Sequence, residues 1–154
     1  MIATAVQFYD VAIFFHVSAV VLAFGPTFAY GLFLAVAQRD GGVAIPSVGR
    51  AMMTWDRIAG TLGMTVVLIS GIYLVSDGPY EASEFFVSWG FVAIIALFGL
   101  SHGYFAPKTR RIVELAQRDL ETGAGKEMSG EFNALSQQVA RVGGATGLLI
   151  ILSI

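Results

Sequence analysis

Four long stretches without a charged side chain dominate this sequence. They run from about Val11 to Ala37, Ile58 to Val75, Phe85 to Ala106 and Val142 to Ile154. A helix needs about 20 mainly apolar residues to cross the ~30 Å hydrocarbon layer of a membrane. Three of the stretches are near or above that length, and the fourth is short. We therefore predict an all-α fold, an integral membrane four-helix bundle.

The links between the stretches set the expected helix boundaries. We expect one domain over residues 1–154, with helices at about 8–38, 47–76, 83–120 and 129–154. The segment "TRRIVELAQRDLE" has helical spacing, so the third helix should continue beyond the membrane as a helical extension, which "TGAGKEMSGE" ends. Gly25 and Pro26 should kink the first helix, because proline lacks a backbone donor and clashes with the preceding turn.

Pairs of small residues four positions apart mark candidate contacts between helices. They are Gly99 with Gly103, Gly143 with Gly147, and Ala59 with Gly63. Such spacing lets two backbones approach closely, although glycine is common in membrane helices in any case. We expect close helix packing at these positions.

All nine Lys and Arg residues lie in two of the links. They fall between the first and second stretches and between the third and fourth, whereas the N-terminal segment and the acidic loop "SDGPYEASE" have none. Cytoplasmic loops carry an excess of Lys and Arg. The distribution predicts that both basic links and the extension are cytoplasmic and that both termini are outside. With no cation before Arg39, the first stretch should be a retained helix and not a signal peptide.

The composition excludes several classes of site. Only 13% of the residues are charged, against about 25% in an ordinary soluble domain. There is no cysteine, so disulfides, thiolate metal sites and cysteine nucleophiles are absent. A net charge of −2 provides no basic surface for nucleic acid. No Ser-His-Asp set, carboxylate pair or phosphate-binding loop is recognisable, and the sequence leaves open whether the protein is an enzyme.

Two histidines lie within the membrane stretches. His16 is in "IFFHVSAVVLAF" and His102 is in "GLSHGYF", each beside small residues that leave space for another helix or a flat ligand. Polar side chains within membrane helices are costly and usually face the bundle interior. Haem b, with His16 and His102 as ligands of its iron, is the candidate cofactor.

Depth in the membrane argues against one haem held by both histidines. His16 lies six residues inside Asp10 and His102 six residues before Lys108, which places each about 9 Å from opposite faces. In a ~30 Å layer the two imidazoles are then about 12 Å apart in depth. Met64 lies near the depth of His102, and histidine–methionine ligation is a known haem arrangement. His102 with Met64 is thus a second candidate pair.

Other roles for these residues stay open on the sequence alone. Each histidine can instead bond to a neighbouring helix and fix the packing, or take part in a proton or ion relay. Methionine commonly fills gaps in packed cores. Asp10 and Asp56 are expected at the membrane interface, with Asp56 and Arg57 as a candidate surface pair.

The first and third stretches resemble a group of small bacterial four-helix membrane proteins. The resemblance rests on "FFHVSAVVLAFGPTF", where a histidine precedes a stripe of small residues, and on "WGFVAIIALFGLSHGYFAPKTRRI", with a tryptophan, a late histidine and a basic exit. The group includes a predicted integral membrane family of unknown function, the membrane domain of copper resistance protein D and the membrane-type protoporphyrinogen oxidase.

This resemblance implies a multi-pass protein of the bacterial cytoplasmic (inner) membrane. For the oxidase branch it also implies haem binding, which maps onto His16. That branch uses a lysine within the membrane as well, and the third stretch has none before Lys108. This departure from the family pattern argues against oxidase activity.

Three functional hypotheses follow. The first is a haem-associated or redox-linked membrane protein that uses His16 and His102. The second is an accessory subunit of a larger membrane complex, or a homo-oligomer. Residues 141–154 rise about 20 Å, so the fourth helix should leave the region of His16 open to a partner helix, a lipid or a second copy. The third is a small transporter, against which the scarcity of intramembrane charge argues.

Overall fold

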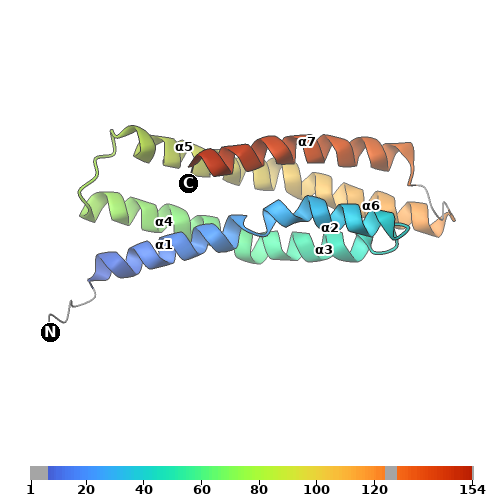
Figure 1. The fold of residues 1–154 in the computed structure, drawn as a ribbon, viewed down its shortest axis with the longest axis horizontal. Coiled ribbons are helices and arrows are strands. Elements are labelled where there is room, and N and C mark those ends of the chain that lie inside the picture. The colour runs from blue at the N-terminus through green and yellow to red at the C-terminus, as the bar shows by residue number, and fades with distance from the viewer. Residues whose placement is uncertain (1–6, 124–127, 154) are drawn as a thin grey trace.

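The computed structural model describes residues 7–123 and 128–153, most of them helical (Figure 1). The elements are α1 (Phe8–Phe24), α2 (Thr27–Arg39), α3 (Ile45–Trp55), η1 (Asp56–Gly60), α4 (Thr61–Asp77), α5 (Phe85–Leu100), η2 (Ser101–Phe105), α6 (Ala106–Glu121) and α7 (Gly130–Ser153). The π-helical turns η1 and η2 join their neighbours without a break. In the described part of the chain, four long helices result, and each is long and apolar enough to cross a membrane. The all-α prediction is confirmed.

The long helices lie alongside one another in an elongated bundle (Figure 1). α1 begins at the end of the bundle that carries the α4–α5 connection, and the α2–α3 and α6–α7 connections lie at the opposite end. Successive long helices therefore run antiparallel, and α7 returns toward the end at which α1 begins. This up-and-down order is the usual one for a bundle with short links.

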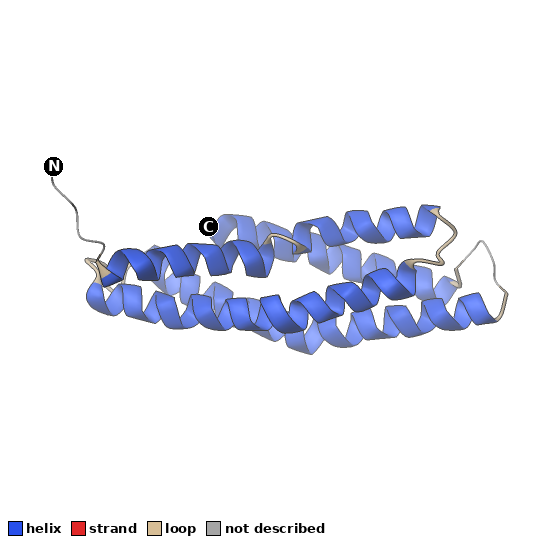
Figure 2. Ribbon diagram, turned by 90° about the horizontal axis from the view of Figure 1, so that it is seen from below, coloured by secondary structure: helices blue, strands red, loops and turns tan. Residues whose placement is uncertain are grey.

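The first long helix is interrupted near its centre. α1 ends at Phe24 and α2 begins at Thr27, with the turn at Gly25 and Pro26 between them (Figure 2). The Thr27 hydroxyl donates to the Phe24 carbonyl oxygen at 2.6 Å, so that carbonyl has a partner at the break. The structure confirms the kink that the Gly-Pro pair predicts.

Two clusters of buried side chains divide the bundle into two halves. One half, built from α1, α4, α5 and the end of α7, encloses Ala23, Phe24, Met64, Ile94, Leu97 and Ile150. The other, built from α2, α3, α6 and the start of α7, encloses Ala37, Ile45, Ile112, Leu115, Ala116 and Phe132. In this second half α6 buries its apolar residues and exposes Arg110, Arg111 and Glu114. Such an amphipathic helix suits contact with water on its outer face.

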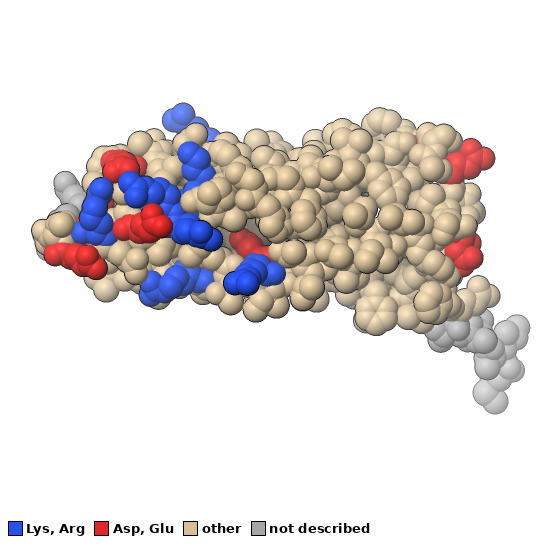
Figure 3. Space-filling view, turned by 180° about the vertical axis from the view of Figure 1, so that it is seen from behind, with Lys and Arg blue, Asp and Glu red and all other residues tan. Residues whose placement is uncertain are grey.

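Charge is distributed unequally along the bundle. Lys and Arg side chains gather over one end, whereas the opposite end shows only acidic side chains (Figure 3). We call the end with Lys and Arg the basic end and the opposite end the acidic end. The carboxylates of the acidic end are Asp10, Asp77, Glu81 and Glu84. Between Arg57 and Asp77 the chain has no charge and rises about 30 Å, which matches the hydrocarbon thickness of a bilayer. This pattern is typical of a multi-pass membrane protein.

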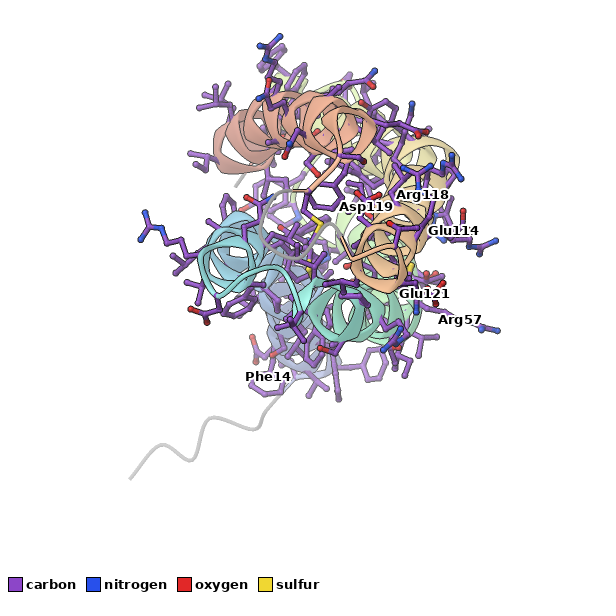
Figure 4. All side chains as sticks on the ribbon, turned by 90° about the vertical axis from the view of Figure 1, so that its right-hand side faces the viewer. Phe14, Arg57, Glu114, Arg118, Asp119 and Glu121 are labelled. Atoms are coloured by element: carbon purple, nitrogen blue, oxygen red, sulfur yellow. The ribbon has the colours of Figure 1, made fainter. Side chains whose placement is uncertain are left out.

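At the basic end, carboxylates and arginines neutralise one another. Glu131 of α7 accepts from Arg111 at 2.9 Å and from Arg118 at 3.2 Å. Asp119 is buried, accepts from the Ser129 backbone N–H at 2.9 Å and pairs with Arg118 at 3.1 Å. The Ser129 hydrogen bonds, and then the Arg118 charge, hold the pKa of the Asp119 carboxyl below its usual value. Viewed from this end, Asp119 lies nearer the bundle axis than Arg118 (Figure 4). These bonds tie α7 to α6.

α1 and α4 pack backbone to backbone at Gly63. An added Cβ there would lie 2.8 Å from the Ala23 Cβ and 3.2 Å from the Ala19 carbonyl oxygen. Any side chain larger than hydrogen would therefore push the two helices apart. The predicted close contact is confirmed at this position.

The other small-residue pairs behave differently. A Cβ at Gly147 would make ordinary contact with the Phe28 ring at 3.6 Å, and one at Gly143 would lie 4.0 Å from the Phe105 ring. At Gly99 and Gly103 an added Cβ would meet no described atom within 4 Å. The prediction of a close helix contact is wrong for this last pair, because its face of α5 and η2 is turned away from the neighbouring helices.

We expect Gly63→Ala to loosen the packing of α1 on α4. Overpacking of this kind costs about 1–3 kcal/mol. The control Gly99→Ala adds a methyl group to open space, where alanine favours the helix by about 1 kcal/mol. Thermal unfolding in micelles, followed by circular dichroism, should show a lower Tm for the first variant and an equal or higher Tm for the second. Equal Tm values for Gly63→Ala and the wild type would contradict the close contact.

Candidate functional site

A pocket of about 430 Å³ lies between the helices near the acidic end. α1, α4, α5, the loop after α4 and the last turns of α7 all contribute to its wall. Small-molecule sites in proteins commonly measure about 300–1,000 Å³. The lining is mostly apolar, and its polar side chains are Tyr9, His16, Tyr80 and Ser153. The pocket therefore suits a largely apolar ligand of modest size.

α4 holds His16 in a fixed orientation. The Nδ1 atom lies 2.8 Å from the Ser70 Oγ atom, which in turn lies 2.5 Å from the Val66 carbonyl oxygen. A hydroxyl has one proton and a carbonyl oxygen can only accept, so the Ser70 proton points to Val66. His16 Nδ1 must then carry a proton and donate it to Ser70. In the neutral ring this leaves the lone pair on Nε2.

The Nε2 atom of His16 is the polar group that a ligand can use. Among the described residues the imidazole has two polar neighbours, the Ser70 hydroxyl at Nδ1 and the Val67 backbone, and no hydrogen bond is assigned to Nε2; the His16 side chain lines the pocket. Nε2 can accept a hydrogen bond or bind a metal ion. Metal-bound histidines are commonly oriented by a hydrogen bond from the other ring nitrogen, as Ser70 provides here.

Glycines shape the space around His16. A Cβ at Gly71 would lie 3.4 Å from the His16 Cε1 atom, so the ring sits against the bare backbone of α4. Across the pocket on α5, a Cβ at Gly90 would meet no described atom within 4 Å. Near the end of α4, a Cβ at Gly78 would lie 2.7 Å from the Tyr9 hydroxyl oxygen, so only glycine lets Tyr9 approach there. Larger side chains at these positions would fill or deform the pocket.

His102 has partners on both ring nitrogens. Nδ1 lies 3.1 Å from the Phe98 carbonyl oxygen, and Nε2 lies 3.1 Å from the Thr61 hydroxyl oxygen. The carbonyl can only accept, so Nδ1 donates to it and Nε2 accepts from Thr61 when the ring is neutral. The ring also stacks on Phe98 at a centroid distance of 4.7 Å. These contacts fit the packing role for His102 better than the role of a ligand.

The structure does not bring the predicted ligand residues into one site. Ser70 and Thr61, the partners of His16 and His102, are nine residues apart on α4, about 13 Å along the helix axis. This separation agrees with the estimate from membrane depth. Met64 is buried in the apolar core of its half of the bundle, where methionine commonly fills space.

Asp56 makes a contact that sequence reasoning missed. Its carboxylate accepts from the Tyr30 hydroxyl at 2.7 Å, and no ion pair joins it to Arg57 among the described residues. The predicted surface pair is therefore wrong. Asp56 begins η1, and its carbonyl oxygen lies 3.3 Å from the Thr61 hydroxyl oxygen, which is also 3.1 Å from His102 Nε2 in η2, so the one hydroxyl proton of Thr61 can serve either acceptor. Thr61, the first residue of α4, thus lies between the two π-helical turns, and turns of this kind recur at functional sites.

His16 could hold the iron of haem b, but the pocket lacks partners for the two haem propionates. His16 offers one imidazole nitrogen to the haem iron. A metal ion without haem would need several ligands, and the described part of the chain contains no group of three or more His, Cys, Asp or Glu that could hold one. Haem also carries propionate groups, which are anionic at neutral pH. The acidic end has no Lys or Arg in the N-terminal segment or in the α4–α5 loop. Buried anions need a partner of opposite charge, and this region supplies none.

Comparison with protein families, with curated proteins and with solved structures found no match for the chain. The resemblance to small bacterial membrane proteins therefore stays a prediction, as does haem binding. What the pocket binds must be inferred from its own residues.

Sequence reasoning found His16 and missed its surroundings. Ser70 and Gly71 form a polar, small pair within the second apolar stretch. A hydroxyl is a common partner for a polar group on a neighbouring membrane helix. Ser70 could therefore have been proposed from the sequence as the partner of His16. Gly90 carried no such signal, because its role depends on which way α5 faces.

We expect Ser70→Ala to release His16 from its single tautomer. With only two histidines in the chain, 15N-histidine labelling gives resonances that His102→Ala assigns. At pH 9, wild-type His16 should carry its proton on Nδ1. In Ser70→Ala, His16 should show a mixture of both tautomers, whereas the His102 resonances should stay unchanged. A wild-type His16 protonated on Nε2 would contradict the hydrogen-bond assignment.

Proposed function

We propose that this chain is a multi-pass protein of the bacterial cytoplasmic membrane that binds an apolar ligand, drawn from the membrane, beside His16. The observation that carries the proposal is the free Nε2 atom of an imidazole whose other nitrogen is fixed by Ser70. The apolar wall suits a hydrophobic body, and the acceptor at Nε2 suits a hydrogen-bond donor on that body. In an apolar pocket, a small number of well-placed polar groups orient the ligand and determine which ligands bind.

The charge distribution supports an orientation for this protein. Every Lys and Arg that the structure describes lies in the half of the bundle away from the acidic end. By the positive-inside rule we place that end, with α3, α6 and the start of α7, in the cytoplasm. The pocket then lies in the outer half of the membrane.

Haem b held by His16 alone is the second candidate. The fixed imidazole with a free nitrogen favours it, and the missing counter-charges for the propionates argue against it. Bound haem would supply redox or ligand-binding chemistry, while Ser70 would orient its histidine. An absorption spectrum of protein purified from haem-replete cells tests this candidate. A Soret band that His16→Ala abolishes and His102→Ala preserves would support it.

The pocket itself is tested by filling it. We expect Gly90→Phe to place a ring in the pocket without a clash, because the added side chain begins in open space. Gly99→Phe is the matched control, since it lies on the same helix, also points into open space and does not line the pocket. The probe is 1-aminoanthracene, a neutral aromatic amine whose fluorescence rises in apolar sites, added to protein in lipid nanodiscs.

The wild type and Gly99→Phe should show saturable fluorescence enhancement above that of empty nanodiscs, and Gly90→Phe should not. His16→Ala should weaken binding about 2- to 10-fold, as loss of one hydrogen bond implies, whereas His102→Ala should leave it unchanged. Equal enhancement in the wild type and Gly90→Phe would overturn the proposal. So would the absence of any saturable signal in the wild type.

A further inference from the structure

Four carboxylates lie within two residues, along the chain, of side chains that line the pocket. Asp10 directly follows Tyr9, Glu81 directly follows Tyr80, Asp77 lies two residues after Val75, and Glu84 lies two residues before Phe86. Tyr9, Val75, Tyr80 and Phe86 all line the pocket. The acidic side chains at this end are visible as separate groups on the surface in Figure 3. The charged side chains near this end of the pocket are therefore all acidic among the described residues.

No cation neutralises this field within the described residues. The four carboxylates accept hydrogen bonds only from neutral groups: Asp10 from the Gln7 backbone, Asp77 from the Tyr73 hydroxyl at 2.6 Å, and Glu81 and Glu84 from groups in their own loop. All described ion pairs lie at the basic end instead. The potential at the acidic end is therefore negative, and it attracts cations over about 10 Å at 0.1 M salt.

The rings that line the pocket add a second preference for positive charge. Tyr9, Tyr80, Phe86 and Phe91 contribute aromatic side chains to the wall, and the Tyr80 and Phe86 rings meet edge to face at 5.3 Å. The faces of aromatic rings attract organic cations, and quaternary ammonium groups are commonly bound in aromatic surroundings. This observation is independent of the carboxylates and points to the same ligand charge.

We propose that the ligand of this pocket is an amphiphilic organic cation, with its charged group among the aromatic rings and carboxylates at the acidic end and its apolar body in the pocket. This inference rests on the proposed function, since it concerns the same pocket. It excludes anionic amphiphiles, whose head would meet four like charges and no cation. Like charges facing one another across a site oppose binding strongly.

The test uses two probes of matched shape and opposite charge, tetraphenylphosphonium and tetraphenylborate. Trp89 reports binding, because its neighbour Gly90 lines the pocket and its indole N–H donates to Ser153. A Trp55→Phe background makes Trp89 the single tryptophan. Binding is measured by fluorescence quenching in nanodiscs of neutral lipid, at 20 mM and at 1 M NaCl.

The test variant carries Asp10→Asn, Asp77→Asn, Glu81→Gln and Glu84→Gln together, which remove the charge and keep oxygen acceptors. Its control carries Glu114→Gln and Glu121→Gln at the basic end. Comparing variants in the same lipid cancels the partition of each probe into the bilayer. Circular dichroism verifies that both fold.

At low salt, tetraphenylphosphonium should bind the neutralised variant about tenfold more weakly than the wild type and the control. Four negative charges, each about 10 Å from the bound cation, together account for a change of about that size in water. In 1 M salt this difference should shrink to less than about threefold. Tetraphenylborate should not lose affinity in the neutralised variant. Equal affinity of the phosphonium for all three proteins, or tighter wild-type binding of the borate, would overturn the inference. If the neutralised variant fails to fold, insensitivity of wild-type phosphonium binding to salt would overturn it too.

These outcomes are separable from failure of the proposed function. The neutral probe 1-aminoanthracene carries no charge at neutral pH, so its loss in Gly90→Phe tests the pocket alone. A pocket that binds the neutral probe but shows no charge preference would leave the proposed function standing and end this inference.

Discussion

The backbone contact of α1 and α4 at Gly63 fixes the position of His16. Ala23 meets Gly63 where the two helices touch. His16 lies seven residues before Ala23 on α1, and Ser70 lies seven residues after Gly63 on α4. Because the two helices run antiparallel, these two residues come together again, and their side chains are hydrogen-bonded. Seven residues are close to two helical turns, so the same faces meet again. The packing of small residues thus sets the geometry of the polar pair.

The two halves of the bundle differ in their exposed side chains. The half around Ala23 and Met64 has apolar side chains inside and outside, as expected of helices in lipid. The half around Ile45 and Leu115 has an apolar core and a charged outer face along α6, whereas α2 exposes Leu32, Phe33 and Val36. The pocket lies in the first half, near the acidic end. A ligand that dissolves in the membrane therefore has a short path to it.

Much of the fold could be predicted from the sequence because its signals are local. Charge-free stretches gave the four long helices, Gly25-Pro26 gave the break, and the spacing after Pro107 gave the extension. The pocket could not be predicted in the same way. It depends on the rotation of α5, which places Gly90 in the pocket wall and leaves Gly99 outside it. A uniformly apolar helix carries little information about which face packs.

Asp56 illustrates a second limit of the sequence. Its place beside Arg57 indicated a surface pair, but it accepts from Tyr30 instead. The π-helical turn that begins at Asp56 changes the angular position of the residues around it. A prediction based on regular α-helical spacing cannot include this change.

The central claim is that the helices cross a membrane with the pocket on the side away from the cations. Because the chain has no cysteine, single exposed positions can be labelled with a membrane-impermeant maleimide in bacterial cells whose outer barrier has been removed. Ser83→Cys, in the acidic loop, should react in intact cells, and Ser47→Cys, near the basic end, should react only after the membrane is opened. Reaction of both positions from the same side would contradict the account.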